Sequence, residues 1–282
     1  DLHKAIRRQR QMCIRDRFND ILVAQTLSLG IEVRKELIFN LLYKILREQG
    51  EEIRGLYERN DVKIRLLEGM EENKGWFALA EAPEPGEPLT AIVENGIKYN
   101  VDVENGQKTG FFLDQKYNRQ AIAKIARGKH VLDCFTHTGA FALNAAAGGA
   151  ASVTAVDISA EAVQMTEVNA AKNGLDKIVK GLKANVFDLL SELVNSKSRA
   201  YDFIILDPPA FTKSGSTVKN AIRGYKEINL KAMKLLPRGG YLATCSCSHF
   251  MDYELFTKTI HQAAQNVHKR IRQVEYRTQA PD

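Results

Sequence analysis

From residue 119 onward, short apolar segments alternate with segments of helical periodicity. The apolar segments lie at 131–135, 152–156, 179–182, 203–206, 241–245 and 271–276. The helical patterns lie at 121–126, 140–147, 160–173, 187–194, 221–236 and 253–264. Such alternation is typical of a parallel sheet that is covered by helices on both faces. We therefore predict a doubly wound α/β domain with a mostly parallel sheet over residues 119–282.

The preceding part of the chain has shorter and less regular patterns. Residues 35–49 form a strong helix candidate that ends at Gly50. Its apolar stripe, which we expect to lie in a core, consists of Leu37, Ile38, Leu41, Leu42, Ile45 and Leu46. Strand candidates lie at 21–27, 53–57, 62–67, 75–81, 91–94, 97–103 and 111–113. Asn95-Gly96 and Asn105-Gly106 are hairpin signals between such runs. We predict a smaller, hairpin-rich α+β domain over residues 18–118.

The net charge of +6 is concentrated at one end of the chain. Residues 1–17 contain six Lys and Arg against two Asp, a net +4, which leaves +2 for residues 18–282. Charge alone is therefore a weak argument for a nucleic-acid partner. We expect residues 1–17 to be a basic tail or junction segment, either disordered or the end of a helix.

Cysteine usage and hydropathy favour an intracellular protein. Four cysteines are too few for a disulfide framework in a chain of 282 residues, and their spacing is poor for zinc, so we predict no metal site. No stretch approaches the roughly 18–20 apolar residues of a membrane span, and no signal peptide is visible. We expect a cytoplasmic protein without a membrane partner, and the sequence leaves its oligomeric state open.

The turn after the first strand of the α/β domain is built from small residues. Asp133 lies on the strand, and Thr138, Gly139 and Ala140 follow in the turn. Small residues there let a ligand approach the backbone at the N-terminus of the next helix. A nicotinamide dinucleotide would require G-x-G-x-x-G, of which only Gly139 is present, so we expect a ligand without phosphates. An ordinary β–α turn is the alternative.

The next two strands each end in a polar residue. Asp157 lies 18 residues after Gly139, close to the roughly 20 expected for an acid that binds ribose hydroxyls. Asn185 follows the third strand, where an amide can bind the edge of adenine. As the alternative, Asp157 or Ser159 caps one helix and Asn185 caps another. Gly139 and Asp157 together favour a nucleoside site at the carboxyl ends of the strands.

The fourth and fifth strands end in an acid and in two thiols. The fourth strand leads into Asp207-Pro208-Pro209-Ala210-Phe211, where the prolines stiffen the loop and the phenyl ring offers a face to a planar ring. Cys245 and Cys247 are two residues apart at the end of the fifth strand and share one face of it. A thiol at this edge is a nucleophile candidate, whereas we expect Cys134 to be an inert core residue.

Together these motifs resemble the bacterial large-subunit ribosomal RNA methyltransferase I family, which makes 5-methylcytosine. The resemblance extends over most of residues 16–282. Besides the strand-end motifs, it rests on Tyr57-Glu58-Arg59-Asn60-Asp61-Val62, Glu94-Asn95-Gly96, Gln107-Lys108-Thr109-Gly110-Phe111-Phe112-Leu113-Asp114-Gln115, Arg119 and Ser246-Cys247-Ser248. It implies a class I, Rossmann-like methyltransferase fold, S-adenosyl-L-methionine as cofactor and large-subunit ribosomal RNA as partner.

The resemblance also implies roles for single residues. Cys247 would be the nucleophile, with Cys245 as the fallback, and Asp207 would bind the polar edge of cytosine. Gln115 and Arg119 would close over the cofactor. The implied cofactor-binding residues are Gln115, Arg119, Asp133, Phe135, Thr136, Thr138, Gly139, Asp157, Ile158, Asn185 and Val186. The implied substrate-binding residues are Pro208, Pro209 and Phe211.

The sequence departs from that family in three places. It lacks the family's N-terminal PUA RNA-binding domain, residues 12–17 look like a foreign junction, and six strand candidates stand where the fold usually has seven. We therefore expect a C-terminally truncated fragment. Two alternatives stay open: a methyltransferase of exocyclic amines in nucleic acids that uses the Asp-Pro-Pro loop, and a truncated, inactive protein that only binds cofactor or RNA. In amine-methylating enzymes an aromatic residue usually follows the second proline directly. Here Ala210 lies between Pro209 and Phe211, which counts against the first alternative.

Overall fold

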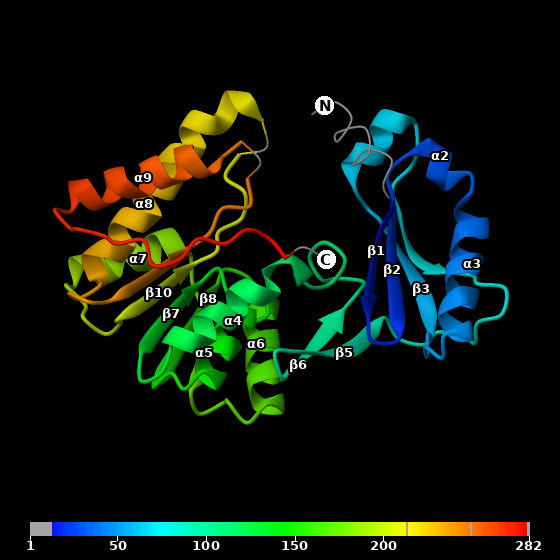
Figure 1. Ribbon diagram of the computed structural model, residues 1–282, viewed down its shortest axis with the longest axis horizontal. Coiled ribbons are helices and arrows are strands. Elements are labelled where there is room, and N and C mark those ends of the chain that lie inside the picture. The colour runs from blue at the N-terminus through cyan, green and yellow to red at the C-terminus, as the bar shows by residue number, and fades with distance from the viewer. Residues whose placement is uncertain (1–12, 213, 249, 281–282) are drawn as a thin grey trace. The chain divides into compact units, whose positions relative to one another are not determined.

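The chain folds into two compact units. A computed structural model describes residues 13–212, 214–248 and 250–280. The first unit comprises the residues through Glu94 together with Lys98–Leu113, and the second comprises Asn95–Ile97 and the residues from Asp114 onward (Figure 1). The second unit thus begins a few residues before the predicted boundary at 118, because it includes most of η2 (Leu113–Gln115) and the start of α4 (Lys116–Ile125).

The first unit is built on a four-stranded mixed sheet in the order β1 (Cys13–Phe18), β2 (Ile21–Thr26), β3 (Gly55–Asn60) and β4 (Asn73–Phe77). β2 and β3 are parallel, and the two outer pairs are antiparallel. The crossover between β2 and β3 contains α2 (Leu29–Glu32) and α3 (Lys35–Glu48), and α3 packs on the sheet through Phe39 and Tyr43. The predicted hairpin at Asn95-Gly96 is confirmed: it joins β5 (Leu89–Glu94) to β6 (Ile97–Asp102), and both turn residues have positive φ, as a type I′ turn requires.

Two secondary-structure predictions for this unit are wrong because long-range polar contacts or strand pairing override the local pattern. Residues 13–17, expected in a tail, pair with β2 as part of β1, while residues 1–12 lie outside the described residues. The predicted strand at 62–67 is instead the 3₁₀ helix η1 (Lys63–Glu68). Its Arg65 is 2% exposed and donates through Nη1 to Thr26 Oγ1 at 2.7 Å and to Glu32 Oε2 at 3.0 Å. An extended segment would carry this guanidinium away from both acceptors.

Two further details of the first unit also differ from expectation. The predicted strand at 111–113 does not form, and the chain turns there into η2. In α3, the stripe residues Leu37, Leu41 and Ile45 are 63%, 48% and 48% exposed. The aromatic residues Phe39 and Tyr43 occupy the centre of the buried face, so only one edge of the predicted stripe reaches the core.

The second unit contains the predicted doubly wound α/β fold, which is confirmed. Its five parallel strands are β7 (His130–Cys134), β8 (Ser152–Asp157), β9 (Val179–Lys183), β10 (Phe203–Leu206) and β11 (Tyr241–Thr244), in the order β11-β10-β7-β8-β9. Helices α4, α5 (Ala140–Ala147) and α6 (Ala160–Lys172) pack on one face (Figure 1). Helices α7 (Val186–Asn195) and α8 (Val218–Leu235) pack on the other face, and α9 (Tyr253–Asn266) packs against α8.

The predicted sixth strand at 271–276 does not form. Among the described residues this segment pairs with no strand, and Val274 and Tyr276 are 74% and 54% exposed. The ring of Tyr276 packs instead against Tyr253 at the start of α9, with 4.4 Å between ring centroids. Strand propensity reflects the packing of side chains on a pleated surface, so a short apolar pattern forms a strand only where a neighbouring strand is available.

The strand order reverses between β7 and β10. From β7 the chain continues to β8 and β9 on one side, and from β10 it continues to β11 on the other. In such sheets ligands bind at the carboxyl ends of the strands, beside the reversal. The loops that follow β7, β8, β10 and β11 therefore form the candidate site.

Candidate functional site

The turn after β7 has an unusual backbone conformation. Phe135, His137 and Gly139 have φ values of 64°, 53° and 84°. Positive φ is uncommon for residues other than glycine, and such positions are concentrated at functional sites. At Gly139 a Cβ atom would lie 2.6 Å from Thr166 Cγ2 and 2.7 Å from Leu143 Cδ1, so both the backbone and the packing require glycine. The turn is thus held in one conformation.

Two buried side chains of α6 hold this turn, and the sequence analysis missed both. Thr166 Oγ1 donates to the carbonyl oxygen of His137 at 3.1 Å, and Asn169 Nδ2 donates to that of Thr138 at 3.1 Å. Both residues are fully buried. Polar residues three positions apart on the buried face of a helix are the signal that indicates such a role.

Asp133 places a buried carboxyl group under the turn. It is 1% exposed, and Thr136 Oγ1 donates to its Oδ2 at 2.6 Å. Burial raises the pKa of Asp133 to about 7; the hydrogen bond from Thr136 opposes this rise, and the charges of Asp207 and Asp157 add to it. The charges of two neighbouring acids thus act on the buried carboxyl group of Asp133.

Asp157 ends β8 and faces the same turn. Its Oδ2 accepts from the backbone N–H of His137 at 2.9 Å, and its Oδ1 accepts from that of Ser159 at 3.0 Å. Each carboxylate oxygen can accept a further hydrogen bond, so the group can also bind two ribose hydroxyls. Ser159, and not Asp157, caps α6, since its hydroxyl accepts from the N–H of Ala162 at 3.1 Å. Of the two residues proposed as alternatives for capping α6, Ser159 is confirmed and Asp157 is not.

Ile158, Asn185 and Val186 lie beside Asp157 at the ends of β8 and β9. Ile158 is 67% exposed, an apolar side chain that a flat base could cover. Asn185 caps α7, because its Oδ1 accepts from the N–H of Phe187 at 2.9 Å. Its contact with adenine stays a prediction, and Val186 is buried, so only its backbone could take part.

Gln115 and Arg119 lie at the start of the second unit. Gln115 precedes α4, and its Oε1 accepts from Asn118 Nδ2 at 2.6 Å. Arg119 lies within α4 and is 1% exposed, so its guanidinium is buried rather than open to solvent. A role for either residue in closing over a cofactor stays a prediction.

The Asp207 loop continues β10 between its two neighbours. The N–H of Asp207 donates to the carbonyl oxygen of Cys134 on β7, and the N–H of Cys245 donates to that of Leu206 at 2.8 Å. Pro208 is buried, whereas Asp207 is half-buried and Pro209 is exposed. The backbone of the acid is thus held at the sheet edge by both neighbouring strands.

Phe211 packs among protein rings at the end of this loop. Its centroid lies 5.8 Å from that of Phe187 and 4.6 Å from that of Tyr225. The ring is half-buried. Its stacking on a substrate ring therefore stays a prediction, and the observed role is to anchor the loop.

The structure distinguishes the two thiols by their burial, whereas their spacing along the strand could not distinguish them. Cys247 is exposed, and its Sγ lies 3.8 Å from the carbonyl oxygen of Pro208. Cys245 packs against the core, where burial raises the pKa of its thiol well above the ordinary value and the charge of Asp207 adds to the rise. Because the thiolate is the nucleophile, Cys247 is the better candidate. Cys134 is fully buried in the core, as expected.

The predicted residues therefore meet at one edge of the sheet. Gly139, Asp157, Asp207 and Cys247 follow β7, β8, β10 and β11, which are neighbours in the sheet and run in the same direction. The carboxyl ends of parallel neighbours lie side by side. The four candidate residues thus lie at adjacent strand ends.

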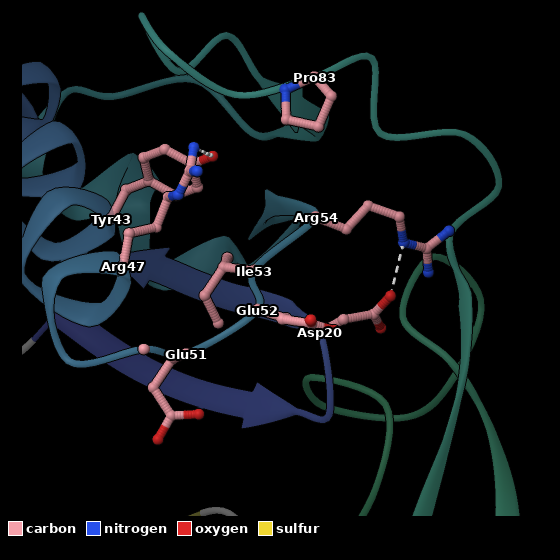
Figure 2. A pocket seen from close by; sticks show the side chains of 9 residues that line it. Asp20, Tyr43, Arg47, Glu51, Glu52, Ile53, Arg54 and Pro83 are labelled. Carbon is pink, nitrogen blue, oxygen red and sulfur yellow. Dashed lines mark hydrogen bonds and ion pairs between the residues drawn. The ribbon is translucent and has the colours of Figure 1, made fainter.

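A shallow groove of about 480 Å³ lies in the first unit and has a different character. Figure 2 shows Arg54 beside Asp20 across this groove, with 3.0 Å between Nε and Oδ2. Arg47 lies over the ring of Tyr43, and Glu51 pairs with Arg17 at 2.7 Å. Two of its charged groups, Arg54 and Asp20, pair with each other, and the groove contains neither a thiol nor a strand-end turn like the one after β7.

The described part of the chain contains no candidate metal centre and no candidate membrane-spanning helix. Among residues 13–212, 214–248 and 250–280, no three His, Cys, Asp or Glu side chains lie close enough together to hold a metal ion. In the same part of the chain, no helix has the length and apolar character that crossing a membrane requires.

Comparisons with known proteins agree with the geometry. A family model described as S-adenosylmethionine-dependent methyltransferase matches residues 79–282. Ribosomal RNA large subunit methyltransferase I of Aeromonas salmonicida (strain A449) is 42% identical over 268 residues, which are 95% of this chain and 65% of that protein. The chain thus spans about 65% of the length of the curated relatives it matches.

Solved structures show the same fold. The crystal structure of SMU.776 complexed with SAH matches with a TM-score of 0.71 at 28% identity, over 89% of this chain and 62% of that chain. Trm5b from Pyrococcus abyssi, at 18% identity, matches in fold alone, with a TM-score of 0.62 over 95% of this chain and 70% of that chain. On the strength of the family match and the strand-end geometry, this chain belongs to the S-adenosylmethionine-dependent methyltransferase family.

Proposed function

We propose that this chain is part of a cytoplasmic enzyme that methylates C5 of a cytosine in large-subunit ribosomal RNA. The observation that supports this most directly is an exposed thiol, Cys247, at the same sheet edge as Asp207 and the nucleoside-type turn. The relative from Aeromonas salmonicida is named for large-subunit ribosomal RNA, which favours this substrate. A thiol nucleophile favours a ring carbon over an exocyclic amine, since amine methylation needs no covalent activation.

The residues at the ends of β7 and β8 fit S-adenosylmethionine. Asp157 would bind the ribose hydroxyls, and the exposed Ile158 would cover one face of the adenine. Gly139 leaves the backbone of the turn open to close approach. The charges of Asp157 and Asp207, which act on this edge of the sheet, would favour the positive charge of the cofactor. When bound, the cofactor supplies an electrophilic methyl group on a sulfonium centre.

Cytosine C5 is a poor nucleophile until the ring is activated. The Cys247 thiolate would add to C6, and the electron pair of the C5–C6 double bond would then let C5 take the methyl group. A base then removes the C5 proton, and the electron pair of that C–H bond restores the double bond and expels the thiolate. Asp207 would hydrogen-bond the polar edge of the ring and hold C6 against the sulfur. An ordinary thiol has a pKa of about 8.5, and only its thiolate form is the nucleophile.

The test compares two cysteine variants of the purified chain. Ribosomal RNA from cells that lack the gene is incubated with S-adenosylmethionine, and product nucleosides are identified by mass spectrometry. We expect Cys247→Ser to lose methylation while cofactor binding, measured by isothermal titration calorimetry, is unchanged. The matched variant Cys245→Ser should keep most activity, because that side chain packs against the core.

Full activity of Cys247→Ser would reject covalent catalysis. A product methylated on an exocyclic amine would favour the alternative chemistry of the Asp-Pro-Pro loop. Cofactor binding without turnover in the unchanged chain would favour a protein that only binds.

A further inference from the structure

Tyr225 of α8 contacts both loops that carry the proposed catalytic pair. We propose that it is a positioning residue, whose hydroxyl and ring together set where Cys247 faces Asp207. The inference rests on the proposed function, since it concerns the nucleophile named there. Nothing in the sequence pattern singles out Tyr225, which lies 18 residues beyond Asp207 and 22 before Cys247.

The hydroxyl of Tyr225 holds the loop that carries Cys247. The residue is fully buried, and Ser246 Oγ donates to its hydroxyl oxygen at 3.1 Å. Ser246 is the neighbour of Cys247, so this bond ties the Cys247 loop to α8. Phe211 ends the Asp207 loop, and its ring packs on the ring of Tyr225. Tyr225 therefore contacts one loop through its hydroxyl and the other through its ring.

The ring of Tyr225 is held from both sides. It lies 4.6 Å from the ring of Phe211 and 5.5 Å from that of Phe256 on α9, measured between centroids. The preceding residue, Gly224, has no side chain, and a Cβ there would lie 3.0 Å from Phe211 Cδ2. Phe211 thus packs directly on the α8 backbone beside Tyr225.

The Cys247 loop depends on such side-chain contacts because the regular strand ends before it. β11 ends at Thr244, and beyond it the backbone bond from Cys245 to Leu206 continues the pairing with β10. Farther on, Cys247 Sγ lies 3.8 Å from the carbonyl oxygen of Pro208, and Ser248 Oγ donates to that of Thr212 at 3.1 Å. At Ser246, the residue beside the proposed nucleophile, the hydrogen bond to Tyr225 connects the Cys247 loop to α8.

The phenol acts as a neutral group at physiological pH. Burial raises the pKa of Tyr225; the hydrogen bond from Ser246 opposes this rise, and the nearby charges of Cys247 and Asp207 add to it. Tyr225 therefore stays protonated and influences Cys247 through hydrogen bonding and packing. Because the ring is fully buried, it does not touch a substrate.

The experiment removes the hydroxyl and keeps the ring. Tyr225→Phe is compared with Tyr201→Phe, whose hydroxyl donates to Thr154 Oγ1 at 3.2 Å in the same unit but contacts neither loop. The measurements are kcat, the KM for S-adenosylmethionine, and the pH dependence of Cys247 alkylation by iodoacetamide, followed by peptide mass spectrometry. We expect Tyr225→Phe to lower kcat about 10- to 100-fold, the loss typical of a misplaced reacting group, and to shift the alkylation profile. The KM should stay within about twofold.

A second variant guards against a loss of folding. Ser246→Ala removes the other end of the same hydrogen bond, and it should shift the alkylation profile as Tyr225→Phe does, with little additional effect in the double variant. An alkylation profile and kcat that match the unchanged chain in both variants would overturn the proposal. Tyr201→Phe should match the unchanged chain throughout, and an equal loss there would also overturn it.

The outcomes separate this inference from the proposed function. An inactive Cys247→Ser together with a fully active Tyr225→Phe rejects the positioning role alone. A fully active Cys247→Ser rejects the nucleophile, and the alkylation profile of Cys247 still measures whether Tyr225 positions that thiol.

Discussion

Gly139 offers a quantitative test of the turn after β7, through the substitution Gly139→Ala. Its φ of 84° is a conformation that costs an L-residue about 1–2 kcal/mol. The new Cβ would also lie 2.6 Å from Thr166 Cγ2, a methyl group on a stiff β-branched side chain. Such overpacking typically costs about 1–3 kcal/mol. We expect a total loss of about 2–5 kcal/mol in the free energy of unfolding of the second unit.

Gly239→Ala is the matched control for the backbone term. Gly239 has a φ of 81°, and a Cβ there would meet no atom within 4 Å. This variant should therefore lose only the backbone contribution of about 1–2 kcal/mol. The difference between the two variants isolates the clash with Thr166 and Leu143, which we expect to be about 1–3 kcal/mol.

Urea unfolding followed by far-UV circular dichroism measures both losses, and calorimetric titration with S-adenosylmethionine measures the effect on binding. We expect Gly139→Ala to weaken the cofactor at least about tenfold, or 1.4 kcal/mol, because the turn must shift to admit the methyl group. Gly239→Ala should bind as the unchanged chain does. Equal losses of stability in the two variants, or unchanged binding by Gly139→Ala, would refute the packing argument.

Two further predictions concern pH. Because folding raises the pKa of Asp133 from 3.8 to about 7, the folded chain holds a proton that the unfolded chain releases within that window, so the stability from this group falls as the pH rises from about 4 to 7. Asp133→Asn should flatten that part of the curve in circular-dichroism melts, and an unaltered slope would contradict the assignment. Burial alone would raise the pKa of Glu32, but hydrogen bonds from Arg65, Thr26 and Lys35 lower it to about 2. The ionised carboxylate therefore contributes at most about 3 kcal/mol to the stability of the first unit. This contribution is present above pH 4.5 and is lost as the pH falls towards 2. Glu32→Gln should make the first unit less sensitive to acid over that range. The fluorescence of Trp76, the chain's single tryptophan, reports this transition. An unchanged acid transition would argue against this role of Glu32.

Sequence patterns were most reliable in the second unit. Its five strands and the helices between them lie within a few residues of the predicted ranges, because each is a short apolar run or a periodic helix bounded by turn residues. The predictions failed where distant residues decide the local structure. Arg65 turns inward to Thr26 and Glu32, so a segment with a strand pattern becomes a 3₁₀ helix. Residues 271–276 have a strand pattern but no neighbouring strand.

The same distinction applies to the site. Gly139, Asp157 and Asp207 could be proposed as site residues from the sequence because each lies at the end of a strand or in the turn after it. Thr166, Asn169 and Tyr225 were not found, since their roles depend on which distant carbonyl or hydroxyl group they meet. Their helices are recognisable from periodicity, but the partners of each side chain are not.

By itself, the sequence determined the α/β alternation of the second unit and the polar residues at its strand ends, because these follow from local periodicity and turn chemistry. Only the tertiary structure decided the order β11-β10-β7-β8-β9, which determines which strand ends are neighbours at the edge that carries the four loops. It also decided that Cys247 is exposed while Cys245 packs against the core. Strand order and burial arise from contacts between residues that are distant in the chain, and a pattern within any one segment does not contain them.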